Sequence, residues 1–150
     1  MTDEAFYQEA ILRLARAASG AGRLEAPDGS ATLDNPLCGD RVSVEVGVRE
    51  GRIAALAHRV RGCLLCQAAA SLLGRAAAGS TPAEVEEARG RLAEVLRSGA
   101  EPPRGAWGDL AAFAPVGPVP SRHGCLLLPF DALVEALARA SGRPGAAGTP

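Results

Sequence analysis

The sequence predicts a mixed fold in which helices pack with a small antiparallel sheet. The sheet is predicted by four valines that alternate with polar or small residues, a period of two that buries one face of a strand; they are Val42, Val44, Val46 and Val48. Glu50-Gly51 then forms a turn signal, and residues 52–60 return as a second strand. Because two strands rarely stand alone, we expect a third strand, or helices packed on the sheet.

The first element along the chain is predicted to be a helix that begins at a Thr2 or Asp3 cap. Its apolar residues recur at helical spacing; they are Phe6, Tyr7, Ala10, Ile11, Leu14 and Ala18. The Ser-Gly-Ala-Gly run at 19–22 ends this helix. Residues 19–36 are rich in Gly, Pro and Asp, and we expect them to form a loop before the two strands.

Three more helices are predicted after the strands. An alanine-rich helix covers 64–78 and stops at Gly79. The next helix has a capping box, with Thr81 as the cap and Glu84 three residues later, and it stops at Gly99. Proline-rich residues 100–121 are expected to be irregular, with a short turn near 107–113. The last helix covers 129–140, and residues 141–150 form a frayed tail.

The composition restricts the class of protein. A chain of 150 residues suits one domain, which we place at 1–140. The formal net charge of −1 argues against nucleic-acid binding, and the apolar runs are too short to span a membrane. The acidic start lacks the basic residues of a signal peptide, so we expect a cytoplasmic protein. Four cysteines in a reducing compartment indicate free thiols, a metal site or redox chemistry.

Three of the four cysteines share a local setting. Cys38, Cys63 and Cys125 each lie at a break between predicted elements, and the last two come just before predicted helices. A helix N-terminus lowers the pKa of a nearby thiol. Asp40 lies two residues after Cys38, and alternate residues of an extended segment project to the same side. Three thiolates and one carboxylate could complete a tetrahedral zinc site, or hold an iron–sulfur cluster with one weak oxygen ligand.

Other residues near these cysteines have two interpretations each. Cys63 and Cys66 form a C-x-x-C pair, which is typical of redox pairs and half zinc sites, but Cys66 also fits a plain helix interior. His123 is either a nearby acid, base or spare ligand, or a solvated loop histidine. Three arginines flank the cysteines and either offset the charge of a thiolate-rich site or are solvated surface; they are Arg41, Arg61 and Arg122.

Several segments resemble one protein family. Asn35-Pro-Leu-Cys-Gly-Asp40 resembles the N-P-x-C-G-D signature of the iron–sulfur assembly scaffold family, which comprises IscU, the N-terminal domain of NifU, and SufU. Gly62-Cys63 with Ala70-Ser71 resembles a second family segment. Pro120-Ser-Arg122, with Cys125 and the Leu-Leu-Leu-Pro-Phe-Asp-Ala-Leu run after it, resembles the family's ending. The connection before the last cysteine is long, which is similar to SufU and unlike IscU, whose connection is shorter.

The resemblance implies an α+β fold, with an antiparallel sheet of about three strands and helices on one side. It assigns Cys38, Asp40, Cys63 and Cys125 as ligands of Zn²⁺ or of a nascent [2Fe–2S] cluster, with Cys66 and His123 as substitutes. It also implies persulfide sulfur taken from a SufS-like cysteine desulfurase, accepted by Cys38 as in SufU-like members or by Cys125 as in IscU-like members. The implied clients are apo iron–sulfur proteins, and the implied state is a monomer or weak homo-oligomer.

The sequence leaves alternatives open at this stage. The resemblance is compatible with an assembly scaffold and with a zinc-dependent sulfurtransferase partner of the desulfurase. Cys66 stands where the family usually has serine, and it is a fourth thiolate, a resolving partner for Cys63 or an inert thiol. A thiol redox protein that uses Cys63 and Cys66 is one alternative function. A divergent relative with a purely structural zinc is another.

Overall fold

The α+β fold is confirmed in a computed structural model, which describes residues 8–142. The elements, in chain order, are α1 (Glu9–Ala17), β1 (Gly29–Asn35), β2 (Asp40–Arg49), β3 (Arg52–Arg61), α2 (Leu64–Ala76), α3 (Pro82–Ser98), the 3₁₀ helices η2 (Gly105–Val116) and η3 (Pro120–Arg122), and α4 (His123–Ala140). The three strands form one antiparallel sheet in the order β1-β2-β3. The expected third strand and the expected packed helices are therefore both present.

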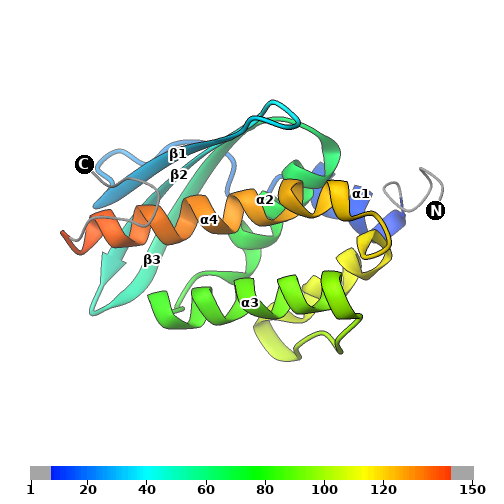
Figure 1. The fold of residues 1–150 in the computed structure, drawn as a ribbon. Coiled ribbons are helices and arrows are strands. Elements are labelled where there is room, and N and C mark those ends of the chain that lie inside the picture. The colour runs from blue at the N-terminus through cyan, green and yellow to red at the C-terminus, as the bar shows by residue number, and fades with distance from the viewer. Residues whose placement is uncertain (1–7, 143–150) are drawn as a thin grey trace.

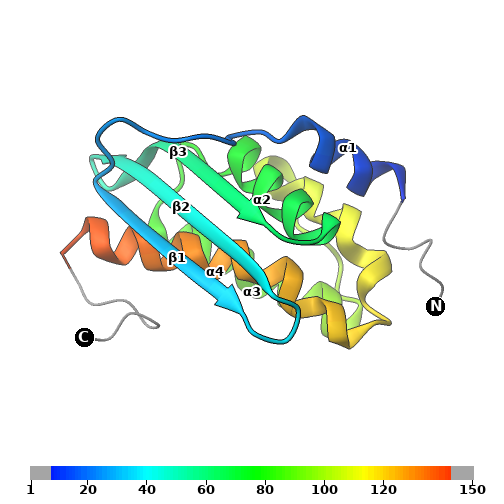
Figure 2. The same ribbon diagram turned by 90° about the horizontal axis from the view of Figure 1, so that it is seen from above.

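The sheet has one covered face and one open face. The valines at 42, 44 and 46 are buried and point towards the helices. The long helix α4 runs beneath β1 and β2, and α2 packs against α4 and β3 (Figure 1). The view onto the sheet in Figure 2 shows α4 and α3 lying behind it. Alternation along β2 therefore places its polar side chains on the open face.

The β1 strand corrects the predicted loop over 19–36, because residues Gly29–Asn35 pair with β2 along their whole length. This segment is mostly polar and small, so its sequence carries little of the period-two apolar signal on which strand prediction depends. Gly29 explains part of that composition. A Cβ atom at this position would lie 2.2 Å from the Ala136 carbonyl oxygen of α4. The close approach of β1 to α4 therefore requires glycine here.

The start of the last helix is also corrected. Helix α4 begins at His123 and not at residue 129, so Pro129 lies inside it and Cys125 lies in its first turn. Proline inside a helix lacks one backbone donor, but the carbonyl that loses its partner belongs to residue 125, at the very start of the helix. The proline-rich segment before it forms η2 and η3 and is more regular than expected.

Helices α2 and α3 agree closely with the sequence, whereas α1 begins later than predicted, at Glu9 after an extended Gln8 cap. Helix α2 ends two residues earlier than expected. In α3, the Thr81 hydroxyl accepts from the Glu84 amide and the Glu84 carboxylate accepts from the Thr81 amide, which confirms the capping box. The expected cap at Thr2 or Asp3 and most of the predicted tail lie outside the described residues. Within residues 8–142, the helices lack the length and apolar character needed to span a bilayer.

The outer edge of β3 is covered by the chain that follows α1. The His58 amide donates to the Gly20 carbonyl at 2.9 Å, and the Gly22 amide donates to the His58 carbonyl at 2.9 Å. The His58 ring is buried, and its Nε2 donates to the Ser19 carbonyl at 2.6 Å. Its Nδ1 atom is buried without a hydrogen-bond partner among the described residues. Burial lowers the pKa of His58 below its ordinary value.

This histidine gives a prediction for pH-dependent stability. A base whose pKa is lower in the folded state binds more protons when unfolded, so the free energy of unfolding decreases as the pH falls below about 6.5. The slope from His58 is at most about 1.4 kcal/mol per pH unit. We expect His58→Gln, which keeps a donor for Ser19 but does not titrate, to remove this part. The free energy of unfolding is measured by urea unfolding at several pH values, on both proteins after metal is removed with a chelator. If it depends on pH in the same way in wild type and in His58→Gln, the prediction is contradicted.

Candidate metal centre

Three connections meet at one end of the sheet. The β1–β2 turn carries Cys38, and β2 begins at Asp40. Cys63 is the N-terminal cap of α2, immediately after β3, as expected. Cys125 comes from the first turn of α4. Figure 2 shows the β1–β2 turn and the starts of α2 and α4 converging at this end. The fold therefore gathers side chains that are up to 87 residues apart in sequence.

Three of these four side chains, those of Cys38, Asp40 and Cys125, lie close enough to share one ion. The Cys38 and Cys125 sulfurs are 3.6 Å apart. One ligand atom from each of Cys38, Asp40 and Cys125 lies within 4.8 Å of the other two. Cys63 joins this group through Asp40, because its Sγ donates to Asp40 Oδ2 at 3.3 Å and its amide donates to Oδ1 at 3.0 Å. Asp40 is only 3% exposed, so its carboxylate is held in a fixed place.

The spacing fits the donor geometry of zinc. Two thiolates on a tetrahedral Zn²⁺ with bonds of about 2.3 Å have their sulfurs about 3.8 Å apart. A thiolate and a carboxylate oxygen on the same ion are about 3.5 Å apart. The observed 3.6 Å between Cys38 and Cys125, and 3.3 Å between Cys63 and Asp40, are close to these values. Cys38, Asp40 and Cys125 therefore fit three ligands of a zinc ion, and Cys63 lies beside Asp40 as the candidate fourth. The same donor types are compatible with an iron–sulfur cluster as cargo.

The electrostatics of two thiols differ from the expectation. Burial raises the pKa of Cys63 and of Cys125, although both lie at helix N-termini. The Cys66 amide faces the Cys63 sulfur and acts in the opposite direction, but burial has the larger effect. The predicted lowering of these pKa values is therefore wrong for the protein alone. Both thiols keep their protons at neutral pH unless a cation compensates, so metal binding here releases protons.

Comparison with known proteins identifies the family. The model of the family described as "NifU-like N terminal domain" matches residues 6–102 of the chain. The chain belongs to this family. The crystal structure of a nitrogen-fixing NifU-like protein (N-terminal) from Brucella abortus is similar with a TM-score of 0.87 and 32% identity, over 93% of this chain and 96% of that one. Because it covers 93% of this chain, this similarity extends beyond residue 102, where the family match ends.

Two further relatives are similar over most of the chain. The iron-sulfur cluster assembly scaffold protein IscU of Streptococcus pyogenes serotype M1 is 28% identical over 120 residues, which cover 80% of this chain and 75% of that protein. The SufU protein of Fervidobacterium islandicum AW-1 has a TM-score of 0.81 at 24% identity, over 91% of this chain and 99% of that one; this likeness shows the fold alone. The resemblance seen in the sequence is thereby confirmed at the level of family and fold.

The two substitute ligands lie differently in this NifU-like domain. Cys66 is fully buried on α2, one turn beyond Cys63. Burial raises its pKa, and the surrounding acidic groups of the site raise it further. His123 lies at the start of α4, and its Nε2 donates to the Gly117 carbonyl at 3.0 Å. The structure thus brings Cys66 near the site and directs one nitrogen of His123 to the backbone.

The role of Gly62 in this site was not predicted from the sequence. A Cβ atom at Gly62 would lie 2.6 Å from Asp40 Oδ1 and 2.7 Å from Asp40 Cγ. The absence of a side chain therefore makes room for the carboxylate that holds Cys63. The signal was available in the Gly62-Cys63 pair, but only the sheet pairing shows which side chain fills the space.

Gly62→Ala is expected to displace the Asp40 carboxylate and to lower zinc affinity about 10- to 100-fold, the range for disturbing a group that orients ligands. Competition with a chromophoric chelator measures the affinity. Gly90→Ala is the matched control, since a Cβ atom at Gly90 meets nothing within 4 Å. Equal zinc affinities for the two variants would refute the role of Gly62.

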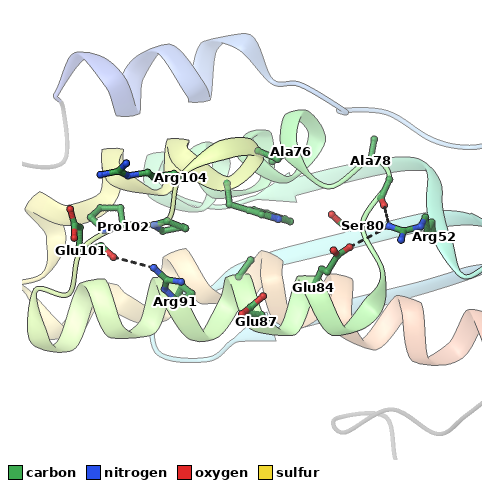
Figure 3. A pocket seen from close by; sticks show the side chains of 15 residues that line it. Arg52, Ala76, Ala78, Ser80, Glu84, Glu87, Arg91, Glu101, Pro102 and Arg104 are labelled. Carbon is green, nitrogen blue, oxygen red and sulfur yellow. Dashed lines mark hydrogen bonds and ion pairs between the residues drawn. The ribbon is translucent and has the colours of Figure 1, made fainter.

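A larger hollow lies away from the cysteines, between α3 and the segment that leads into η2 (Figure 3). It has a volume of about 680 Å³ and is crossed by polar contacts. Arg52 lies 3.5 Å from Glu84 and donates to the Gly79 carbonyl, and Arg91 reaches the Glu101 carbonyl at 3.5 Å. Its lining contains no cysteine. This hollow is therefore separate from the candidate metal centre, which is a small group of side chains at the end of the sheet.

Proposed function

We propose that this chain is an iron–sulfur cluster assembly scaffold in which Cys38, Asp40, Cys63 and Cys125 hold Zn²⁺ or a nascent [2Fe–2S] cluster. The observation that carries this proposal is the 3.6 Å approach of the Cys38 and Cys125 sulfurs beside Asp40. Membership of the NifU-like family and the scaffold name of the Streptococcus relative support it. The ligand set, the cargo and the partners named below are parts of the proposal.

The exposure of the two candidate acceptors supports different roles for them. Cys38 is exposed on the β1–β2 turn, whereas Cys125 is 1% exposed. An incoming protein can reach Cys38 first. In the proposed step, the Cys38 thiolate attacks the outer sulfur of a persulfide on a cysteine desulfurase, and the desulfurase cysteine leaves as a thiolate. Cys125, whose sulfur lies 3.6 Å from Cys38, then stands next to the new persulfide.

Asp40 makes the proposed cluster easy to hand on. A carboxylate is a harder ligand than a thiolate and is less suited to iron in a cluster. Asp40 also holds Cys63 through both its thiol and its amide. One side chain therefore supplies a weak ligand and positions a strong one, which suits transfer to an apo iron–sulfur protein. Bound Zn²⁺ would hold the thiols as thiolates and protect them from oxidation.

Anaerobic reconstitution tests the proposal. The full chain is incubated with ferrous iron, cysteine, a cysteine desulfurase and a thiol reductant that reduces the transferred sulfur to sulfide. The visible absorption spectrum is recorded, and transfer of the cluster to an apo-ferredoxin is then measured. We expect a cluster that is lost in Cys38→Ser and kept in Cys66→Ser. A zinc-retaining protein that only accelerates the desulfurase would favour sulfur transfer over a scaffold.

The remaining outcomes address the two other hypotheses. A reversible disulfide between Cys63 and Cys66, with an activity that survives Cys38→Ser, would favour a thiol redox protein. Melting of the protein by a chelator, with no effect on the desulfurase and no cluster, would favour a structural zinc. Zinc and iron contents far below one per chain in anaerobically purified protein would overturn the proposal.

A further inference from the structure

Three arginines lie together on the open face of the sheet, close to the candidate metal centre. Arg41 is the second residue of β2, after Asp40, and Arg59 and Arg61 lie at the end of β3, shortly before Cys63. All three line a shallow hollow of about 360 Å³ together with Thr32 and Ser43. We call Arg41, Arg59 and Arg61 the basic patch.

The register of the sheet places like charges against one another. Arg41 and Arg61 are direct cross-strand partners, and Arg59 pairs with Ser43 two residues further along the strands, on the same face. Like charges directly opposite each other in a sheet are destabilising. Arg41 is compensated by Asp34, whose Oδ1 lies 2.7 Å from Arg41 Nε. Within residues 8–142, Arg59 and Arg61 are exposed and no carboxylate forms an ion pair with either.

The basic patch does not serve the cysteines directly. Successive side chains of a strand point to opposite faces of the sheet. Asp40 is buried on the helix-covered side with Val42, so Arg41 between them points to the open side. The alternation therefore favours the other interpretation, in which Arg41 and Arg61 are solvated surface residues and do not offset the charge of the thiolate site. Two uncompensated positive charges instead face solvent beside the site.

We propose that the basic patch is a docking surface for an acidic segment of a partner protein. Complementary charge at the rim of an interface steers encounter and sets orientation. The patch adjoins the β1–β2 turn, which carries the exposed Cys38 and Leu37, a leucine that is 96% exposed. An acidic partner docked on the patch would thus meet an apolar contact and the thiol together.

A nucleic acid fits this surface less well. The formal net charge of the chain is −1, so the positive field is confined to the patch. The hollow is lined by Thr32, Ser43, Val60 and the three arginines, with no aromatic ring for base stacking. The inference that the partner delivers or receives sulfur at Cys38 rests on the proposed function. The inference that the patch binds acidic protein does not.

The test uses a fluorescein-labelled oligoglutamate peptide and the full chain, with binding followed by anisotropy at low ionic strength, where screening is weak. We expect Arg59→Glu/Arg61→Glu to weaken binding about tenfold or more. The control is Arg16→Glu/Arg97→Glu, which makes the same change in net charge on the exposed surfaces of α1 and α3. It should bind within about twofold of wild type, because it leaves the patch intact.

Four results would overturn the inference. They are no measurable peptide binding by the wild-type chain, equal losses in the two double variants, no loss in either, and tighter binding of a single-stranded oligonucleotide through Arg59 and Arg61. Cys38→Ser separates this inference from the proposed function. This variant should lose metal but still bind the peptide. If the proposed metal site fails its test, the peptide result can still be interpreted; if peptide binding fails, the metal result can still be interpreted.

Discussion

Cys125→Ser is expected to lower the zinc affinity of the chain by at least about 100-fold. A serine hydroxyl is a much poorer zinc ligand than a thiolate, and losing a ligand costs more than the 10- to 100-fold that follows from disturbing a group behind it. Cys125 is 1% exposed and lies in the first turn of α4, with its sulfur 3.6 Å from that of Cys38. Competition against a chromophoric zinc chelator at neutral pH measures the change.

Cys66→Ser is the matched control for this prediction. It makes the same substitution on a buried cysteine that lies one turn beyond Cys63. We expect its zinc affinity to stay within a few-fold of wild type. A loss equal to that of Cys125→Ser would instead make Cys66 a ligand. Unchanged affinity in Cys125→Ser would contradict the proposed ligand set.

Phe113→Ala is expected to lower the free energy of unfolding by about 3–5 kcal/mol. Phe113 is fully buried in η2 and belongs to the main hydrophobic core. Removing its ring loses the transfer free energy of the buried atoms and leaves a cavity that the core can only partly close. Urea unfolding, monitored by the fluorescence of Trp107 and by circular dichroism, gives the difference.

Leu37→Ala is the control for the loss of a large apolar side chain. Leu37 is 96% exposed, so its truncation should change the free energy of unfolding by less than about 0.5 kcal/mol. A destabilisation by Phe113→Ala of the same size as that by Leu37→Ala would show that η2 does not contribute to the stable core. The comparison therefore tests the segment that sequence reasoning described as irregular.

Elements with strong local signals were predicted well. The valine alternation of β2, the turn at 50–51 and the capping box of α3 are all confirmed. Each depends on contacts between residues that are close in sequence, so the signal and its cause lie in the same short segment. The strand β1 and the early start of α4 were missed for the opposite reason. β1 is polar and exists through pairing with β2, and the turns around Cys125 look like a break until α4 is packed on the sheet.

The candidate site divides in the same way. The proximity of Cys38 and Asp40 and the position of Cys63 as the cap of α2 could be predicted locally. The approach of Cys125 to Cys38 depends on how α4 packs across the sheet, so the sequence offered it only as one possibility, which the family resemblance favoured. The room that Gly62 leaves for Asp40 and the direction of the thiol pKa values depend on burial, which a linear pattern does not show.

The sequence by itself determined the α+β class, the family resemblance and the four residues proposed to bind a metal, because these follow from periodicity and from motifs with fixed spacing. The tertiary structure decided which side chains meet, which thiols keep their protons, and that Arg41 and Arg61 face away from the cysteines. These outcomes depend on strand register and helix packing between segments far apart in the chain. Such long-range contacts set distance, burial and orientation together, and the chemistry of the site follows from all three.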